Sequence, residues 1–383
     1  MKLQSKLPSV GTTIFSQMSQ LAAEHQAINL SQGFPDFPCD PLLPELLFQA
    51  SQQGLNQYAP MPGLLVLREQ IAALTQRCYG RAVCPDRQIT VTSGATEALF
   101  VAIQALVRSG DEVIVFDPAY DSYLPAVELA GGRTVHIPLQ PPEYRVDWQA
   151  VERQISSKTR LIMVNSPHNP TGMVFSRDDW LALEQLVLKH RLFCISDEVY
   201  EHMVFDGLPR HSANQFTQLA ERTVVVASFG KTFHVTGWKL GYAVAPVELT
   251  TEFRKIHQYV TFSSFTPAQQ AIAELMQKKP ELVTNLADFY QQKRDSFRSL
   301  LQSSGFALLP CQGTYFQLAD YSALSALDDV SFCRQLTVDH KVAAIPLSVF
   351  YRQPPQQQVI RFCFAKQPLT LQQAAEKLCR VSR

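Results

Sequence analysis

Short apolar runs alternate with stretches of helical periodicity through the middle of the chain. The apolar runs predict strands at residues 89–92, 112–116, 160–164, 192–196, 223–227 and 240–244. Apolar positions that recur every three or four residues predict helices at residues 96–108, 178–190 and 247–259. Strands that alternate with helices are typical of a mostly parallel sheet that is covered on both faces. We therefore expect one large α/β domain over residues 46–280.

The pattern changes after Pro280. Residues 281–304 carry a long helical period, and shorter alternating segments follow it. These segments lie at residues 306–318, 342–346 and 359–364, with a last helix at residues 370–381. We expect a smaller α+β domain over residues 281–383, to which the turn-rich residues 1–45 return as an N-terminal segment.

Charge and cysteine usage exclude several classes of protein. The chain has 383 residues, and its 34 Lys and Arg balance 34 Asp and Glu, so no basic field favours a nucleic acid. No secretory signal opens the sequence, and the apolar runs are far below the ~18 residues of a membrane span. The eight cysteines form neither a Cys-x-x-Cys pair nor a zinc spacing with histidine. We expect a cytoplasmic protein with no nucleic-acid, membrane or metal partner.

The most informative motif follows the strand predicted at residues 223–227. Lys231 stands at the end of this strand, with Ser228 three residues before it and Lys239 eight residues after it. This arrangement suits pyridoxal 5′-phosphate, because an amine can form a Schiff base with the aldehyde while a hydroxyl and a second cation hold the phosphate. Taken alone, a lysine after a core strand is better explained as a surface residue.

Further candidates follow other predicted strands, where ligands of open α/β sheets bind. Asp197 can keep a pyridine nitrogen protonated, because a neighbouring anion favours the cation. Tyr200 and Asn169 can donate to the phenolic oxygen of the same ring. The structural alternatives are a helix N-cap for Asp197, a core position for Tyr200 and an ordinary turn at Asn169.

Three more segments fit the same ligand. Gly94-Ala95-Thr96 lies between a strand and a helix, where free N–H groups bind anions. Tyr120 can stack on a flat ring, although a core tyrosine is the simpler explanation. Arg361 lies within an apolar strand, where its planar fork suits a carboxylate, of either a substrate or a structural acid.

Together and in this order, the motifs resemble those of the fold-type I, class I/II aminotransferases that use pyridoxal 5′-phosphate. The resemblance extends from Asn29-Leu-Ser-Gln-Gly-Phe-Pro to Ile360-Arg361-Phe, nearly the whole chain. Within the family, the chain resembles the branch that holds kynurenine aminotransferases, glutamine transaminase K and the bacterial methionine aminotransferases, the last most of all. Its likeness to this branch lies in residues 32–37, 57–60, 117–123, 236–241, 257–262 and 345–350.

The resemblance implies a fold and a role for each candidate. It implies a homodimer, in which each chain has a large mixed seven-stranded sheet domain with helices on both faces and a small α+β domain. Lys231 matches the Schiff-base lysine, Asp197 the pyridine partner, and Arg361 the clamp on the substrate carboxylate. The implied cofactor contacts are Gly94, Ala95, Thr96, Tyr120, Asn169, Tyr200, Ser228, Lys239 and, from the neighbouring subunit, Tyr58. The implied substrate contacts are Phe15, Gly33, Asn169 and Arg361.

The reaction that this resemblance implies is transamination between an amino acid and a 2-oxo acid. We expect a neutral amino donor with an apolar or aromatic side chain, methionine first, because the candidate pocket segments are aromatic. These aromatic residues are Phe15, Phe34, Tyr58, Tyr120, Phe350 and either Phe262 or Phe265. A carbon–sulfur β-lyase is the alternative, since it shares the same motifs. A cofactor-bound transcription regulator is disfavoured, because Gln57-Tyr58 comes too early to leave room for a DNA-binding domain.

Overall fold

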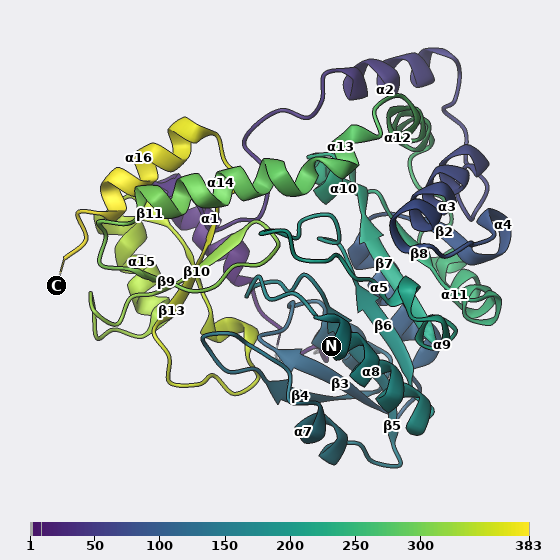
Figure 1. Cartoon of the computed structure of the whole chain (residues 1–383), viewed down its shortest axis with the longest axis horizontal. Helices are drawn as coiled ribbons and strands as arrows, with labels where there is room; N and C mark the ends of the chain where they lie inside the picture. Colours follow the sequence, from purple (N-terminus) through teal and green to yellow (C-terminus); the bar gives the residue numbers. More distant parts are fainter. Residues whose placement is uncertain (1–2, 9, 383) are drawn as a thin grey trace.

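A seven-stranded mixed sheet forms the centre of the large domain (Figure 1). The computed structural model describes residues 3–8 and 10–382. The strands, in spatial order, are β2 (Ile89–Thr92), β8 (Gly241–Val244), β7 (Thr223–Ser228), β6 (Phe193–Asp197), β5 (Thr159–Asn165), β3 (Glu112–Asp117) and β4 (Arg133–Pro138). Strand β8 is antiparallel to both its neighbours, and the other pairings are parallel. The predicted strands of this region are confirmed, and only β4 was not predicted.

The central strands are apolar on both faces, which is why their sequences are continuous apolar runs. Along β5, Leu161 and Met163 pack into one core cluster, whereas Ile162 and Val164 pack into the other. The first cluster includes helices α5 (Ala95–Leu106), α6 (Tyr123–Leu129) and α11 (Val247–Val260). The second includes α3 (Leu65–Tyr79), α8 (Arg177–Lys189) and α12 (Thr266–Lys278). Two-residue alternation therefore separates a core on each face of the sheet.

Helix α8 shows how local sequence fixes where a helix begins, because a capping box of Ser176 and Asp179 lies at its start. The remaining helices are α2 (Leu42–Gln52), α4 (Pro85–Gln88), α7 (Trp148–Arg153), α9 (Thr217–Ala220), α10 (Phe229–Thr232) and the 3₁₀ turns η1 (Ala213–Gln215) and η2 (Thr236–Trp238).

The small domain is built on a four-stranded antiparallel sheet. Its strands, in spatial order, are β12 (Ile345–Pro346), β13 (Val359–Cys363), β10 (Phe316–Asp320) and β9 (Ala307–Leu308). Its helices are α13 (Glu281–Thr284), α14 (Leu286–Leu300), α15 (Asp329–Asp339), the 3₁₀ turn η3 (Ser348–Phe350) and α16 (Pro368–Leu378). The prediction of one continuous helix over residues 281–304 is wrong, because Asn285 interrupts it at ψ 1°.

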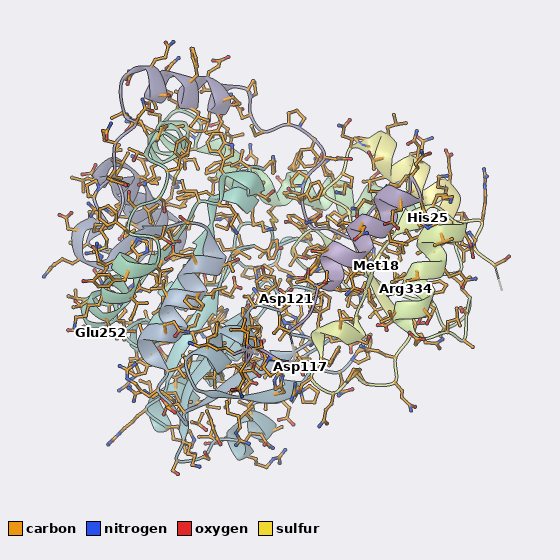
Figure 2. All side chains as sticks on the ribbon, turned by 180° about the vertical axis from the view of Figure 1, so that it is seen from behind. Met18, His25, Asp117, Asp121, Glu252 and Arg334 are labelled. Atoms are coloured by element: carbon orange, nitrogen blue, oxygen red, sulfur yellow. The ribbon has the colours of Figure 1, made fainter. Side chains whose placement is uncertain are left out.

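The N-terminal segment packs on the small domain. Strand β1 (Ile28–Asn29) pairs in parallel with β11 (Val342–Ala343), and α1 (Ile14–Glu24) contacts α15. Figure 2 shows the chain from behind, with Met18 of α1 and Arg334 of α15 on the small-domain side and Glu252 on the opposite side. These contacts support our proposal that residues 1–45, 46–280 and 281–383 are the N-terminal segment, large domain and small domain, although α2, which packs on α12 of the large domain, already begins at Leu42.

The described residues also bear on the expected absences. Across residues 3–8 and 10–382, no helix is long and apolar enough to cross a membrane. The eight cysteines are free thiols. Within the same residues, His, Cys, Asp and Glu form no group of three that could hold a metal ion.

Strand β8 approaches the start of α5 so closely that only glycine fits at its first residue. A Cβ on Gly241 would lie 2.7 Å from the Ala227 carbonyl oxygen and 2.9 Å from the Ala95 nitrogen. Both atoms belong to the backbone and cannot rotate away. In contrast, a Cβ on Gly237 would meet no atom within 4 Å.

We expect Gly241→Ala to lower the free energy of unfolding by about 1–3 kcal/mol, as overpacked sites do. Gly237→Ala is the matched control, since it adds the same methyl group in open space of the same motif. Chemical denaturation followed by circular dichroism measures both. Equal midpoints for the two variants would contradict the steric argument.

Candidate active site

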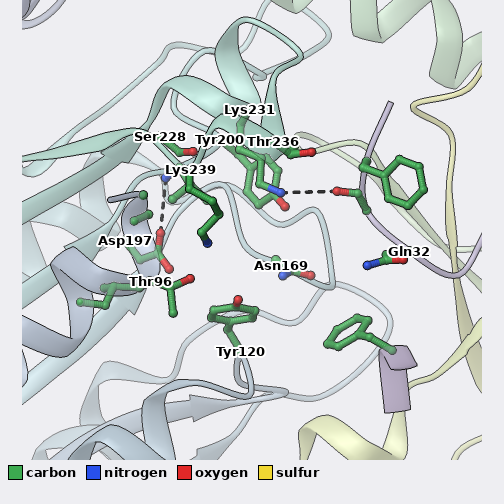
Figure 3. A pocket seen from close by; sticks show the side chains of 18 of the residues that line it. Gln32, Thr96, Tyr120, Asn169, Asp197, Tyr200, Ser228, Lys231, Thr236 and Lys239 are labelled. Atoms are coloured by element: carbon green, nitrogen blue, oxygen red, sulfur yellow. Dashed lines mark hydrogen bonds between the residues drawn. The ribbon is translucent and has the colours of Figure 1, made fainter. Parts of the chain in front are cut away.

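A cavity of about 480 Å³ lies at the carboxyl ends of the central strands (Figure 3). Its walls come from the large domain, from the N-terminal segment and from β10 and β13 of the small domain. Of the predicted site residues, the cavity is lined by Phe15, Gly33, Gly94, Ala95, Thr96, Tyr120, Asn169, Asp197, Tyr200, Ser228, Lys231, Lys239 and Arg361. Thus every predicted cofactor or substrate contact except Tyr58 lines one cavity.

Lys231 lies on α10, directly after β7, and its amine is enclosed at the cavity wall. Its Nζ donates to the Tyr315 hydroxyl (2.8 Å) and more weakly to the Gly33 carbonyl oxygen (3.4 Å). Burial lowers the pKa of Lys231 to about 8, and the positive charges of Lys239 and Arg361 act in the same direction. An amine with this pKa is partly neutral near pH 7–8 and can act as a nucleophile or a base.

Asp197 is the last residue of β6 and is 4% exposed. Its Oδ2 accepts a hydrogen bond from the Tyr123 hydroxyl (2.6 Å), and its Oδ1 accepts a longer one from Val199 N (3.4 Å). Burial raises the pKa of Asp197 to about 6, although the Tyr123 hydrogen bond opposes the shift. Among residues 3–8 and 10–382, no cationic side chain forms an ion pair with this carboxylate, so the cavity offers an anion that lacks a counter-ion.

The start of α5 forms another part of the cavity wall, where Thr96 lies beside Asp197 (Figure 3). Gly94 caps the helix at φ 81°, a left-handed conformation that suits glycine. A Cβ here would lie 3.4 Å from Cε and Nζ of Lys239, an ordinary contact distance, so this lysine lies against the helix start and the φ angle alone favours glycine. Ser228 lines the same region. Free N–H groups, a hydroxyl and an ammonium group together suit a phosphate.

A Glu97–His257 pair supports the turn at Ser93 and Gly94 before α5. Glu97 accepts from Ser93 N (2.9 Å), and its other oxygen bonds to His257 Nδ1 (2.8 Å). The second ring nitrogen of His257 bonds to the Met61 carbonyl oxygen (3.2 Å). In the sequence, His257 belongs to the segment 257–262 that resembles the family, and no periodic pattern indicates its contact with Glu97.

Arg361 lies in β13 and is 1% exposed. Its guanidinium donates to Asn169 Oδ1 (2.8 Å) and to the Ser31 carbonyl oxygen (3.1 Å), and its central carbon Cζ lies 3.8 Å from the centre of the Phe316 ring. Burial lowers its pKa. In the described part of the chain, Nε has no hydrogen-bond partner and no carboxylate forms an ion pair with Arg361. The structural acid considered from the sequence is therefore not found among these residues.

The aromatic residues predicted for the substrate pocket divide into two groups. Phe15 and Phe34 line the cavity, and Phe350 is buried behind Phe15 with ring centres 5.8 Å apart. Tyr58, however, is 83% exposed outside the cavity, where its ring lies 5.3 Å from that of Phe262. Neither Phe262 nor Phe265 lines the cavity within this chain.

Several residues of the site had no signal in the sequence. Tyr315 comes directly before β10 and Phe316 begins this strand, and in the sequence both look like ordinary core aromatics. Asn165 donates to the Asp197 carbonyl oxygen (2.7 Å) and accepts from Asn169 N (2.7 Å), so it orders the loop that carries Asn169. In the sequence, the only indication of this role is that Asn165 is a polar residue directly after the apolar run 160–164.

These groups fit pyridoxal 5′-phosphate. The cavity places an amine, a carboxylate without a counter-ion and an anion-binding helix start around one space, with the Tyr120 ring beside it (Figure 3). The cofactor carries complementary groups: an aldehyde, a basic ring nitrogen and a phosphate. Arg361 remains available for a second, carboxylate-bearing molecule.

Comparisons with known proteins agree with this geometry. The family model for aminotransferase class I and II matches residues 25–378. The chain is 56% identical to methionine aminotransferase of Escherichia coli K12 over 98% of this chain and 97% of that protein. It is 35% identical to human kynurenine–oxoglutarate transaminase 1, over 97% of this chain and 96% of that protein.

A solved structure extends the comparison to the fold. YbdL from Escherichia coli, for which a methionine aminotransferase function was identified, superposes with a TM-score of 0.97 at 55% identity, over 99% of this chain and 100% of that chain. The predicted family and fold class are thereby confirmed. The chain belongs to the class I and II aminotransferases, enzymes that use pyridoxal 5′-phosphate as their cofactor.

Proposed function

We propose that this aminotransferase takes its amino group from a neutral amino acid with an apolar or aromatic side chain, methionine first, and passes it to a 2-oxo acid. The observation that carries the proposal is the set of cations around the cavity. Only Lys231, Lys239 and Arg361 among its lining residues are cationic, and the first two are taken up by the cofactor in this proposal. One carboxylate can therefore be held by an arginine, whereas a second one has no arginine of its own.

The aromatic lining of the cavity supports an amino donor with an apolar side chain. Phe15, Phe34 and Phe316 line it, and each buried apolar Å² contributes roughly 25 cal/mol. A methionine thioether packs well against such ring edges. The 56% identity to the Escherichia coli methionine aminotransferase supports the same choice.

The roles of the site residues are part of the proposal. When bound, pyridoxal 5′-phosphate supplies an electron sink for charge that develops at the substrate Cα. Lys231 would be the attachment point, and its freed amine would take the proton from the substrate Cα and deliver it to the cofactor carbon. Asp197 holds a proton on the ring nitrogen, and Tyr120 stacks on the ring.

The polar walls hold and orient the two ligands. Asn169 and Tyr200 face the phenolic oxygen, and the Asn169 amide oxygen is already committed to Arg361 at 2.8 Å, which leaves its N–H groups for the cofactor. Gly94, Ala95, Thr96, Ser228 and Lys239 bind the phosphate. Arg361 clamps the substrate carboxylate, with Gly33 and Phe15 beside it.

We further propose that the enzyme works as a homodimer in the cytoplasm, where thiols such as its eight free cysteines stay reduced. Tyr58 belongs to a surface depression that we call the rim patch, formed by residues 56–58 and 263–267. Phe265 in this patch is 59% exposed, and Tyr259 nearby along the chain is 90% exposed. Exposed aromatics gathered in this way are typical of a protein interface.

The rim patch is also connected to the cavity. Ser264 shares a hydrogen bond with Ser93 (3.2 Å), the residue before Gly94 in the phosphate-binding loop. A second chain seated on the rim patch would therefore border the phosphate, and its Tyr58 is our candidate for a contact across the interface.

The experiment that tests the reaction is a substrate screen. We expect kcat/KM to be highest for methionine, followed by phenylalanine or histidine, when standard amino acids are assayed with several 2-oxo acid acceptors. Lys231→Ala is the control and should lose at least about 10²-fold. Aspartate or glutamate leading methionine by tenfold would overturn the proposed donor. Pyruvate and ammonia without an acceptor would instead identify a carbon–sulfur β-lyase.

Mixing variants tests the shared site. Tyr58→Ala and Lys231→Ala should each be inactive or nearly so, whereas their mixture should regain partial activity, because hybrid dimers contain one intact site. A mixture of Asp197→Ala and Lys231→Ala is the matched control. It should regain nothing, since both residues belong to the same chain's site. A Tyr58→Ala variant with wild-type turnover, or no recovery on mixing, would count against the shared site.

A further inference from the structure

Tyr315 contacts the amine of Lys231, although neither the sequence nor the proposed function assigns Tyr315 a role. The residue is 0% exposed and lies just before β10 in the small domain. Its hydroxyl donates to the Gly33 carbonyl oxygen (2.7 Å). Because a phenol has a single proton, the 2.8 Å contact with Lys231 Nζ requires the lysine to donate and the phenol oxygen to accept.

The same geometry limits where the lone pair of the amine can point. A neutral amine has two N–H bonds and one lone pair. The Tyr315 oxygen accepts at 2.8 Å, and the Gly33 carbonyl oxygen is a weaker acceptor at 3.4 Å. These two oxygens are hydrogen-bonded to each other at 2.7 Å, so both lie on one side of the nitrogen. An N–H bond directed to that side leaves the lone pair to point away from it. A protonated amine would carry a third N–H, for which the described residues provide no acceptor.

The acceptors are held firmly in place. The Tyr315 ring packs against Tyr200, Tyr290 and Phe316, with ring centres 5.1, 5.6 and 4.9 Å apart. A Cβ on Gly33 would lie 2.6 Å from Phe316 and 3.2 Å from Tyr315, so only glycine lets this carbonyl reach the lysine. The contact joins the N-terminal segment, the large domain and the small domain at one point.

We propose that Tyr315 is a positioning residue, which together with the Gly33 carbonyl group holds the freed amine of Lys231 so that its lone pair faces the substrate Cα. The inference rests on the proposed function, in which Lys231 is released from the cofactor during each turnover. Tyr315 itself transfers no proton, because its only hydrogen remains on the Gly33 carbonyl group.

The first test uses the cofactor-free protein and needs no turnover. Acetic anhydride labels neutral amines, so the pH dependence of labelling at Lys231, read by peptide mass spectrometry, gives its titration midpoint. An acceptor stabilises the ammonium form more than the amine. Tyr315→Phe should therefore lower the midpoint by about 0.5–1 unit.

A matched control separates this contact from packing. Tyr290→Phe removes a hydroxyl from the same buried aromatic cluster, and that hydroxyl has no hydrogen-bond partner in the described residues. It should leave the midpoint unchanged. The other titratable groups around Lys231 are the same in both variants. They are Asp197, Tyr200, Lys239, Arg361 and Cys363.

The second test uses the loaded enzyme. Tyr315→Phe should lower kcat for the best amino donor about tenfold or more, with KM changed less than about threefold, while Tyr290→Phe keeps both. An unchanged labelling midpoint, or a shifted midpoint with unchanged kcat, would overturn the positioning role. Absence of turnover in the wild-type protein would instead overturn the proposed function, and the labelling midpoint would still test the contact.

Discussion

The structure depends on the burial of three ionisable groups around one cavity without counter-ions from the described chain. Burial lowers the pKa of Lys231 to about 8 and raises that of Asp197 to about 6, and it also lowers the pKa of Arg361. Removing charges from water is costly unless they are paired. In the proposed function, the cofactor ring nitrogen and the substrate carboxylate carry charges complementary to Asp197 and Arg361, so the burial of these two groups favours those ligands.

The fold holds these groups in place by joining distant parts of the chain. Parallel strands bring Asp197 and the segment of Lys231 to one edge of the large sheet, and β13 brings Arg361 from the small domain. The pairing of β1 with β11 returns the N-terminal segment, so that Gly33 reaches Lys231. Stability of the small domain and geometry at the lysine are therefore linked through the same backbone.

The sequence predicted the elements whose signal is local. Strands such as β7 are buried on both faces and are therefore continuous apolar runs, which a single sequence shows clearly. In contrast, β4 lies at the sheet edge with most residues partly exposed, so its pattern is weak. Resemblance to a family then brought together residues whose separate motifs were ambiguous.

Contacts between distant segments could not be predicted in this way. Tyr315 and Gly33 are 282 positions apart, and neither residue type carries a periodic signal for their hydrogen bond. The same holds for Asn169, which is 192 positions from Arg361. Tyr58 is the reverse case, because the resemblance gives it a role that one chain cannot show. It is exposed in a single chain, and its proposed role needs a second copy.

The central claim is that Asp197 is a buried anion kept for a cation that the cofactor supplies. Its pKa is raised from 3.8 to about 6 in the folded protein, so the contribution of Asp197 to the stability of the cofactor-free protein falls as pH rises from about 4 to 6. Asn keeps the shape and can still accept from Tyr123, but it carries no charge.

Chemical denaturation of cofactor-free wild type and Asp197→Asn between pH 4 and 8 tests this claim most directly. Above pH 6 the variant should be more stable by up to about 3 kcal/mol, the advantage should vanish near pH 4, and the variant should bind pyridoxal 5′-phosphate more weakly. A variant that is less stable than wild type at pH 8, or a difference that does not change with pH, would contradict the account.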